Sequence, residues 1–200
     1  IDHKLSKDRI ADSIETDEEQ STRVMARHLL ELGHRRIACL SSRETESQAW
    51  SLRRRNSFEA AVRACPGADC RSWRLNQEGT DGIEKALEIL EDRDLRPTAV
   101  FAVTDHEALY VYKAAEKLGL RIPHDISVAG FADLDFAEYL RPGLTTMRQR
   151  SKEIGRRAVE CLLERLHDTM RGDEPKANLV DADLVIREST ARLVEGHPRQ

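Results

Sequence analysis

The 200-residue sequence has no apolar run approaching the roughly 20 residues that a membrane-spanning helix needs. It lacks the glycine-rich G-x-G-x-x-G and G-x-x-x-x-G-K-[ST] signatures, which excludes the common dinucleotide and P-loop phosphate cradles. There is no G-x-S-x-G nucleophile elbow, and the seven histidines include no H-E-x-x-H or other close metal spacing. Since no nucleophile, base and orienting residue fall together, we predict that the chain is not an enzyme and needs no cofactor.

The sequence also lacks a large excess of either charge: 32 Lys and Arg nearly balance 36 Asp and Glu, which gives a net charge of −4. This balance argues against a chain that binds nucleic acid through bulk positive charge. On a helix the Arg53-Arg54-Arg55 run points in different directions, so we expect one arginine inward and two solvated. The four cysteines form no C-x-x-C pair and indicate free thiols in a reducing cytoplasm, although a Cys65–Cys70 disulfide stays open.

Short apolar segments alternate along the chain with stretches of helical period. The expected strands are 37–40, 73–75, 99–103, 126–131, 144–149 and 179–186, and the expected helices are 18–32, 50–64, 81–90, 106–118, 134–140 and 151–170. Asp105 is expected to cap the helix over 106–118. Apolar strands between amphipathic helices predict an α/β fold with a parallel sheet flanked by helices, whose ligands bind beyond the carboxyl ends of the strands.

Five collinear segments carry a more specific pattern. They are 28–38 (HLLELGHRRIA), 96–109 (RPTAVFA running into DHEAL), 119–131 (GLRIPHDISVAGF), 142–149 (PGLTTMRQ) and 186–190 (IREST). Together they resemble the lactose-repressor/galactose-repressor (LacI/GalR) family of bacterial transcription regulators over nearly the whole chain. The resemblance implies a periplasmic-binding-protein-like fold of two α/β lobes, a small effector in the cleft between them, and a homodimer that binds operator DNA through an N-terminal helix-turn-helix domain.

By this resemblance the chain begins after the DNA-binding domain and after most of the first lobe. We therefore expect one complete lobe plus part of a second. Residues 1–16 would be a remnant of the first lobe, 17–145 the second lobe, 146–177 the crossover and a first-lobe helix, 178–190 a strand returning to the second lobe, and 191–200 a tail. The implied function is effector binding and dimerisation in a cytoplasmic regulator whose DNA-reading head lies outside this chain.

The resemblance also implies which residues line the effector cleft. Arg54 matches the arginine of the family's R..GF pattern, and a guanidinium there suits hydroxyl, carboxylate or phosphate oxygens. Trp50 offers a face for stacking on a sugar or other ring, although a core role is equally open. The full predicted set is Asp2, Gln48, Trp50, Arg54, Gln77, Thr104, Ala132, Asp133 and Gln149.

The clearest departure from the family is at position 132, where the pattern GFDD reads GFAD over 130–133. The first Asp of that pair usually grips ligand hydroxyls, which the methyl group of Ala132 cannot do. Either Asp133 reaches into the cleft, or binding is weak, or the effector is not a neutral sugar. If Arg148 and Arg150 on the crossover face the cleft, an anion such as a sugar phosphate or sugar acid is expected; the other interpretation is that both point to solvent.

The resemblance places a dimer face on the second lobe, although ordinary scattered surface residues would give the same pattern. Its predicted members are Leu109, Tyr110, Lys113, Phe136 and Leu140. Two other function classes stay open: a solute-binding protein of a transport system, and an enzyme on the same scaffold. The 122–127 and 144–146 segments look like the repressors rather than the transport proteins, and four free cysteines do not suit a periplasmic protein.

Overall fold

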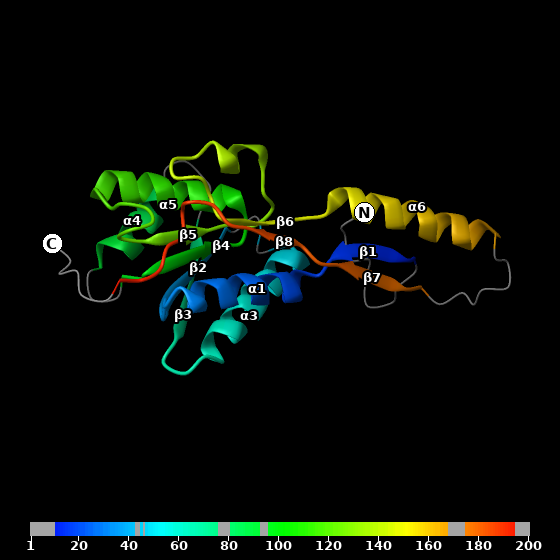
Figure 1. Ribbon diagram of the computed structural model, residues 1–200, viewed down its shortest axis with the longest axis horizontal. Helices are drawn as coiled ribbons and strands as arrows, with labels where there is room; N and C mark the ends of the chain where they lie inside the picture. The colour runs from blue at the N-terminus through cyan, green and yellow to red at the C-terminus, as the bar shows by residue number, and fades with distance from the viewer. Residues whose placement is uncertain are drawn as a thin grey trace.

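The computed structural model describes residues 11–42, 45, 47–75, 81–92, 96–167 and 175–194. Its main body is a parallel sheet of order β3-β2-β4-β5, with helices on both faces (Figure 1). The strands are β2 (Arg36–Ser42), β3 (Asp69–Leu75), β4 (Ala99–Ala102) and β5 (Ser127–Ala129). Helices α1 (Glu18–Glu31) and α3 (Ala49–Arg63) cover one face, and α4 (Asp81–Glu91) and α5 (Asp105–Leu118) cover the other. The predicted fold class is confirmed.

Two apolar cores lie on the two faces of this sheet because β2 and β4 are buried on both sides. Under α1 and α3, the rings of Phe58 and Phe101 stack with their centroids 4.3 Å apart. Under α4 and α5, Leu90 and Val111 pack on Leu40 and its neighbours. All four cysteines are free, so the Cys65–Cys70 disulfide is not formed; Cys70 lies in the first of these cores, whereas Cys65 is half-buried.

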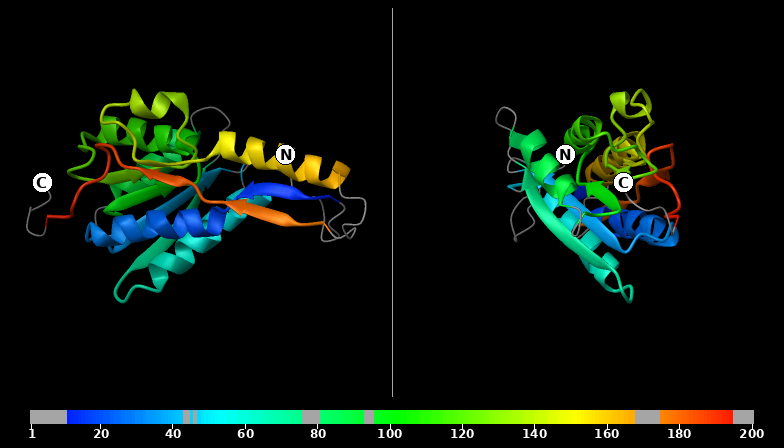
Figure 2. Two further views of the ribbon diagram at one scale, coloured as in Figure 1. Left: turned by 45° about the vertical axis from the view of Figure 1, so that its right-hand side comes forward. Right: turned by 90° about the vertical axis from the view of Figure 1, so that its left-hand side faces the viewer.

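A second, smaller unit extends from one end of the main body (Figures 1 and 2). In it, β1 (Ser13–Thr16) pairs in parallel with β7 (Ala177–Val180), and α6 (Ser151–His167) packs against β1. The antiparallel pair β6 (Thr146–Arg148) and β8 (Asp183–Val185) connects the unit to the main body, where the short helix η1 (Asp135–Glu138) also lies. No residue of α6 is buried, and Leu162 and Leu166 are 59% and 67% exposed.

The last strand, predicted as one segment over 179–186, is two strands in two different sheets. The chain leaves the β1–β7 sheet after Val180, and the backbone N–H of Ala182 donates to Ser21 Oγ of α1 at 3.1 Å before β8 begins. The prediction of one strand was wrong because the change of sheet depends on tertiary pairing, which a run of apolar residues does not reveal. Among the described residues, no helix is both long enough and apolar enough to cross a membrane.

Candidate functional site

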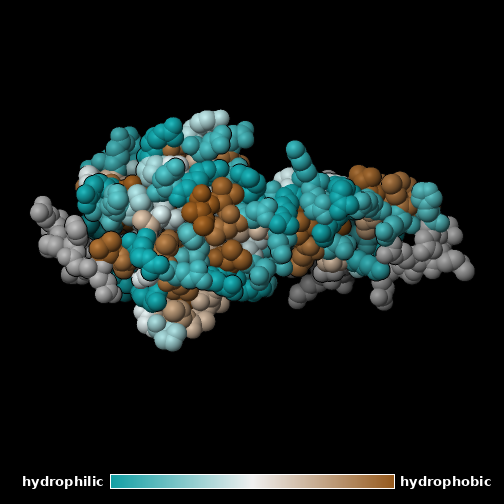
Figure 3. All heavy atoms as spheres, in the orientation of Figure 1, coloured by the Kyte–Doolittle hydropathy of each residue, from teal (hydrophilic) through white to brown (hydrophobic). Residues whose placement is uncertain are grey.

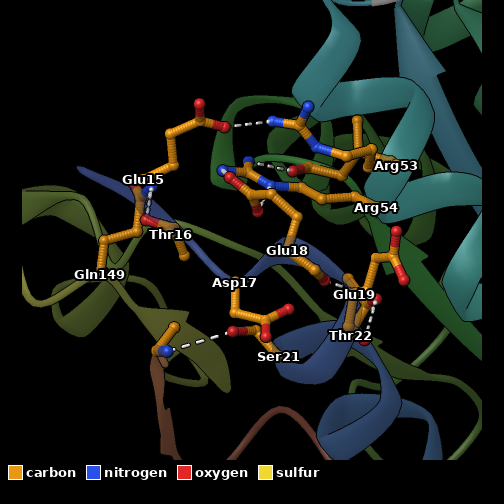
Figure 4. Close-up of polar contacts among 12 residues, drawn as sticks. Glu15, Thr16, Asp17, Glu18, Glu19, Ser21, Thr22, Arg53, Arg54 and Gln149 are labelled. Carbon is orange, nitrogen blue, oxygen red and sulfur yellow. Dashed lines mark hydrogen bonds and ion pairs between the residues drawn. The ribbon is translucent and has the colours of Figure 1, made fainter. Parts of the chain in front are cut away.

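A buried ion pair lies where α1 and α3 meet the carboxyl end of β4. Arg54 on α3 and Glu18 at the start of α1 are 3% and 2% exposed. Arg54 Nε donates to Glu18 Oε2 at 2.5 Å and Nη2 donates to Oε1 at 3.0 Å, while Nη1 donates to the carbonyl oxygen of Val103 at 2.9 Å (Figure 4). This two-point fork satisfies both buried charges at once, which is the arrangement that makes such a pair tolerable away from water. Arg54 is the one inward member that was expected of the arginine run, but Arg53 and Arg55 are half-buried rather than solvated.

Two aromatic rings complete the surroundings of this guanidinium. Arg54 Cζ lies 4.4 Å from the ring centroid of Trp50 and 3.7 Å from that of Phe131. Attraction between a cation and an aromatic face is strongest where water is excluded, as it is here. In this conformation Trp50 therefore stacks on Arg54, and the indole and guanidinium that were predicted to hold an effector hold each other.

Asp105 organises the neighbouring turn from a fully buried position. Its carboxylate accepts hydrogen bonds from Thr146 Oγ1 at 2.6 Å and from the backbone N–H of Leu134 at 2.8 Å. Burial raises the pKa of Asp105, against the lowering effect of these two hydrogen bonds. Its predicted role as a helix cap was wrong: α5 begins at Asp105 itself, and the cap position belongs to Thr104. The Asp105 side chain points into the β5–β6 junction because the Thr146 hydroxyl and the Leu134 N–H donate hydrogen bonds to it there.

The departure from the family pattern coincides with unusual backbone geometry. Ala132 and Asp133 adopt φ angles of +119° and +53°, a region that L-residues seldom occupy. The Asp133 side chain is 7% exposed and forms ion pairs with Arg148 at 2.5 Å and Arg187 at 2.7 Å. Its Oδ1 accepts no hydrogen bond, because the contact with Arg187 is close but not aligned as one. Asp133 thus serves as a counter-ion to Arg148 and Arg187.

The two crossover arginines that motivated an anionic effector are both paired. Arg148 contacts Asp133, and Arg150 forms an ion pair with Asp183. Their side chains are 55% and 48% exposed. The interpretation in which both arginines point to solvent therefore fits the structure better, and the positive charge expected in the cleft is already neutralised.

Side chains from both units meet around this centre. Gln149 Nε2 at the end of β6 donates to Thr16 Oγ1 at the end of β1 at 3.0 Å, and Arg53 pairs with Glu15 at 3.1 Å (Figure 4). On the other side, the hydroxyls of Thr104 and Thr45 both donate to the buried carboxylate of Glu107. The polar centre therefore lies at the junction of the β1 connection, the β6 connection and the sheet.

The predicted site residues are distributed unevenly around this centre. Arg54 and Trp50 are in contact, whereas the side-chain amide of Gln48, at the N-cap of α3, donates to Ser47 Oγ at 3.4 Å. Thr104, Ala132, Asp133 and Gln149 lie on the surrounding turns, while Asp2 and Gln77 lie outside the described residues. Sequence reasoning missed Glu18, although its spacing with the buried Thr22, Met25 and Leu29 already placed it on the inward face of the helix. In the described part of the chain, no cluster of His, Cys, Asp and Glu is suited to a metal ion.

The apolar residues of the predicted dimer face are half-buried and do not form a fully exposed apolar patch. Leu109, Tyr110, Phe136 and Leu140 are all half-buried, and Tyr110 and Leu140 pack on the core of the main body. Lys113 is exposed and forms an ion pair with Glu116. The exposed aromatic side chain of this region is Tyr139, at 70%.

Comparisons with known proteins bear on the family. Residues 26–190 match a family model described as a periplasmic binding protein-like domain. The chain belongs to this family. The HTH-type transcriptional repressors PurR of Photobacterium profundum and Vibrio vulnificus are 32% and 34% identical to it over 186 and 185 residues, which is 92% of this chain and 54% of each repressor. The chain thus spans about half the length of the curated relatives it matches.

Solved structures of the periplasmic binding protein-like family agree. A LacI family regulator from Enterococcus faecium with bound ribose has a TM-score of 0.77 at 27% identity, covering 94% of this chain and 69% of that one. The lac repressor dimer bound to operator has a TM-score of 0.75 at 27% identity, covering 93% and 63%. These findings confirm the resemblance: the chain is a LacI/GalR-type effector-binding region. Its relatives are described as repressors, so a transport protein is not favoured.

Proposed function

We propose that this chain is the effector-binding and dimerisation region of a cytoplasmic bacterial repressor. A small, uncharged, sugar-like effector would bind between the lobes and favour one relative lobe orientation, which the dimer transmits to operator DNA held by an N-terminal helix-turn-helix domain. The ribose-bound regulator and the operator-bound lac repressor dimer support this for relatives of the same fold. A regulator of this kind acts by binding, so we propose no enzymatic activity.

The observation that carries the proposal is the position of the Arg54–Glu18–Trp50 centre at the joint between the two units. Gln149 and Thr16 come from the two separate connections, and their hydrogen bond at 3.0 Å ties one connection to the other. A ligand that changed the angle between the units would change this contact and the Arg53–Glu15 ion pair. The residues of the polar centre are therefore also the residues that join the two units. A hinge whose angle responds to ligand binding requires this overlap.

The chemistry of the centre favours an uncharged effector. Arg54, Arg148 and Arg150 each face a carboxylate, so the centre carries little free positive charge for a phosphate or acid group. Hydroxyl groups can instead exchange hydrogen bonds with side chains such as Thr104, Thr16 and Gln149. An uncharged ligand is therefore our first choice of effector, and sugar phosphates and sugar acids are the alternatives. Because position 132 is alanine and Asp133 is paired with Arg148 and Arg187, we expect a neutral sugar to bind weakly.

Thermal-shift screening of the full-length protein tests this proposal. The panel should pair neutral sugars, ribose among them, with the corresponding sugar phosphates and sugar acids. We expect one or more neutral sugars to raise the melting temperature in a concentration-dependent way, because a ligand that binds the native state stabilises it. If no member of the panel, neutral or charged, shifts the melting temperature, the proposed effector-binding function is overturned.

A further inference from the structure

Glu18 occupies the edge of Arg54 that an anionic ligand would otherwise use. Its two oxygens face Nε and Nη2 at 2.5 and 3.0 Å, which is the geometry in which a guanidinium binds a carboxylate or phosphate from a ligand. The side chains of the pair are 4% and 1% exposed. The anion-binding edge of the only arginine buried in the described residues is thus filled from within the chain.

The rest of the guanidinium contacts uncharged groups, so within the described part of the chain Glu18 is the residue that neutralises Arg54. Nη1 donates to Val103, and the rings of Trp50 and Phe131 lie within 4.4 Å of Cζ. None of these three partners carries a charge. Without the Glu18 carboxylate, the centre would contain a buried cation without a counter-ion, and it would attract an anion from outside.

We propose that Glu18 is the charge-selectivity residue of the effector site: it neutralises Arg54, fixes the guanidinium between Trp50 and Phe131, and restricts the site to uncharged ligands. This inference rests on the proposed effector-binding function and deepens it. Arg54 in this chain is then a scaffold for the indole of Trp50 rather than a direct anchor for ligand acids.

The test uses Glu18→Gln in the full-length protein, with inorganic phosphate as the probe. The amide keeps the size of the side chain and one acceptor oxygen, and it removes the charge. The matched control is Glu15→Gln. It removes the same charge at a position three residues before Glu18, where the carboxylate pairs with Arg53 instead of Arg54. Thermal melts are recorded for both variants and the unmodified protein with phosphate or chloride at constant ionic strength.

We expect phosphate to stabilise Glu18→Gln, with an apparent affinity at least tenfold higher than for the unmodified protein or Glu15→Gln. If Glu18→Gln is unfolded in chloride, recovery of its native circular dichroism spectrum in phosphate would likewise show that phosphate binds and stabilises the variant. An equal phosphate response in all three proteins, or no folded Glu18→Gln in either salt, overturns the charge-selectivity role.

This failure is distinct from failure of the proposed function. If neutral sugars stabilise the unmodified protein while phosphate gains no affinity for Glu18→Gln, the effector site stands and only the role of Glu18 is lost. Glu18→Asp, which keeps the charge on a shorter side chain, should remain as indifferent to phosphate as the unmodified protein.

Discussion

Gly130 lies directly against the buried carboxylate of Asp105: a Cβ atom at Gly130 would stand 2.2 Å from Asp105 Oδ1. It would also stand 3.0 Å from Leu144 Cδ2, in the core of the main body. Because Asp105 is held by Thr146 and Leu134, it has no room to withdraw. The glycine is therefore required by this close approach, which lets the β5–β6 junction pack on α5.

We predict that Gly130→Ala lowers the free energy of unfolding by about 2–3 kcal/mol, the cost of forcing an extra methyl group into a packed core. Urea unfolding of the purified chain measures this change. The matched control is Gly155→Ala in α6, where a Cβ atom meets nothing within 4 Å. That variant should gain about 0.5–1 kcal/mol through helix propensity. Similar unfolding midpoints for the two variants would contradict the prediction.

Local periodicity accounts for most of the fold that the sequence predicts. The helix expected over 106–118 is α5, because Ala108, Val111 and Ala115 recur at helical spacing and Gly119 ends it with a φ of +66°. The strand expected over 99–103 is β4, since four consecutive apolar residues suit a strand covered on both faces. Each of these signals is contained within its own segment, so no tertiary information is needed to interpret it.

The candidate site was only partly predictable because its partners are far apart in sequence. Arg54 was found from its match to the R..GF pattern of the family that the sequence resembles. Its partner Glu18 lies 36 residues earlier, and a glutamate is assigned to the surface by default unless its counter-ion is known. The same reason hid the buried role of Asp105, whose carboxylate meets a hydroxyl 41 residues away.

Stability should fall in acid because His34 is buried in its neutral form. Its Nε2 donates to the carbonyl oxygen of Ala191 at 3.1 Å and its Nδ1 accepts from Thr98 Oγ1 at 3.0 Å. Burial lowers the pKa of His34 from 6.5 to about 4. Neutral His34 therefore contributes fully to the free energy of unfolding above pH 6.5. This contribution, about 3 kcal/mol in total, is lost as the pH falls toward 4.

Urea unfolding between pH 7.5 and pH 4 checks this dependence, with His34→Gln as the test variant. Glutamine does not titrate in this range, so the variant should lose less stability on acidification than the unmodified chain. The control is His124→Gln at an exposed histidine, which should leave the pH profile unchanged. An identical pH profile for His34→Gln and the unmodified chain would exclude His34 as the cause.

Ala132→Gly should stabilise the chain even though glycine is more flexible when unfolded. A residue with a Cβ at a φ of +119° stores about 1–3 kcal/mol of strain, and glycine removes it at an entropic cost of about 0.5–1 kcal/mol. We expect a net gain of about 1 kcal/mol, measured by urea unfolding. Ala60→Gly, at an exposed position within α3, should lose about 1 kcal/mol. A comparable loss for Ala132→Gly would show that the turn is not strained.

The proposed dimer face can be tested by charge at Leu109. This half-buried side chain lies on α5, away from the face of the sheet that α1 and α3 cover. In the full-length protein, Leu109→Asp should shift the sedimentation coefficient from dimer to monomer, because an unpaired carboxylate in an apolar interface must be desolvated. Leu52→Asp on α3, where Leu52 is 36% exposed, adds the same charge on the opposite face and should remain dimeric. If both variants sediment as dimers with unaltered circular dichroism, the interface lies elsewhere on the molecule.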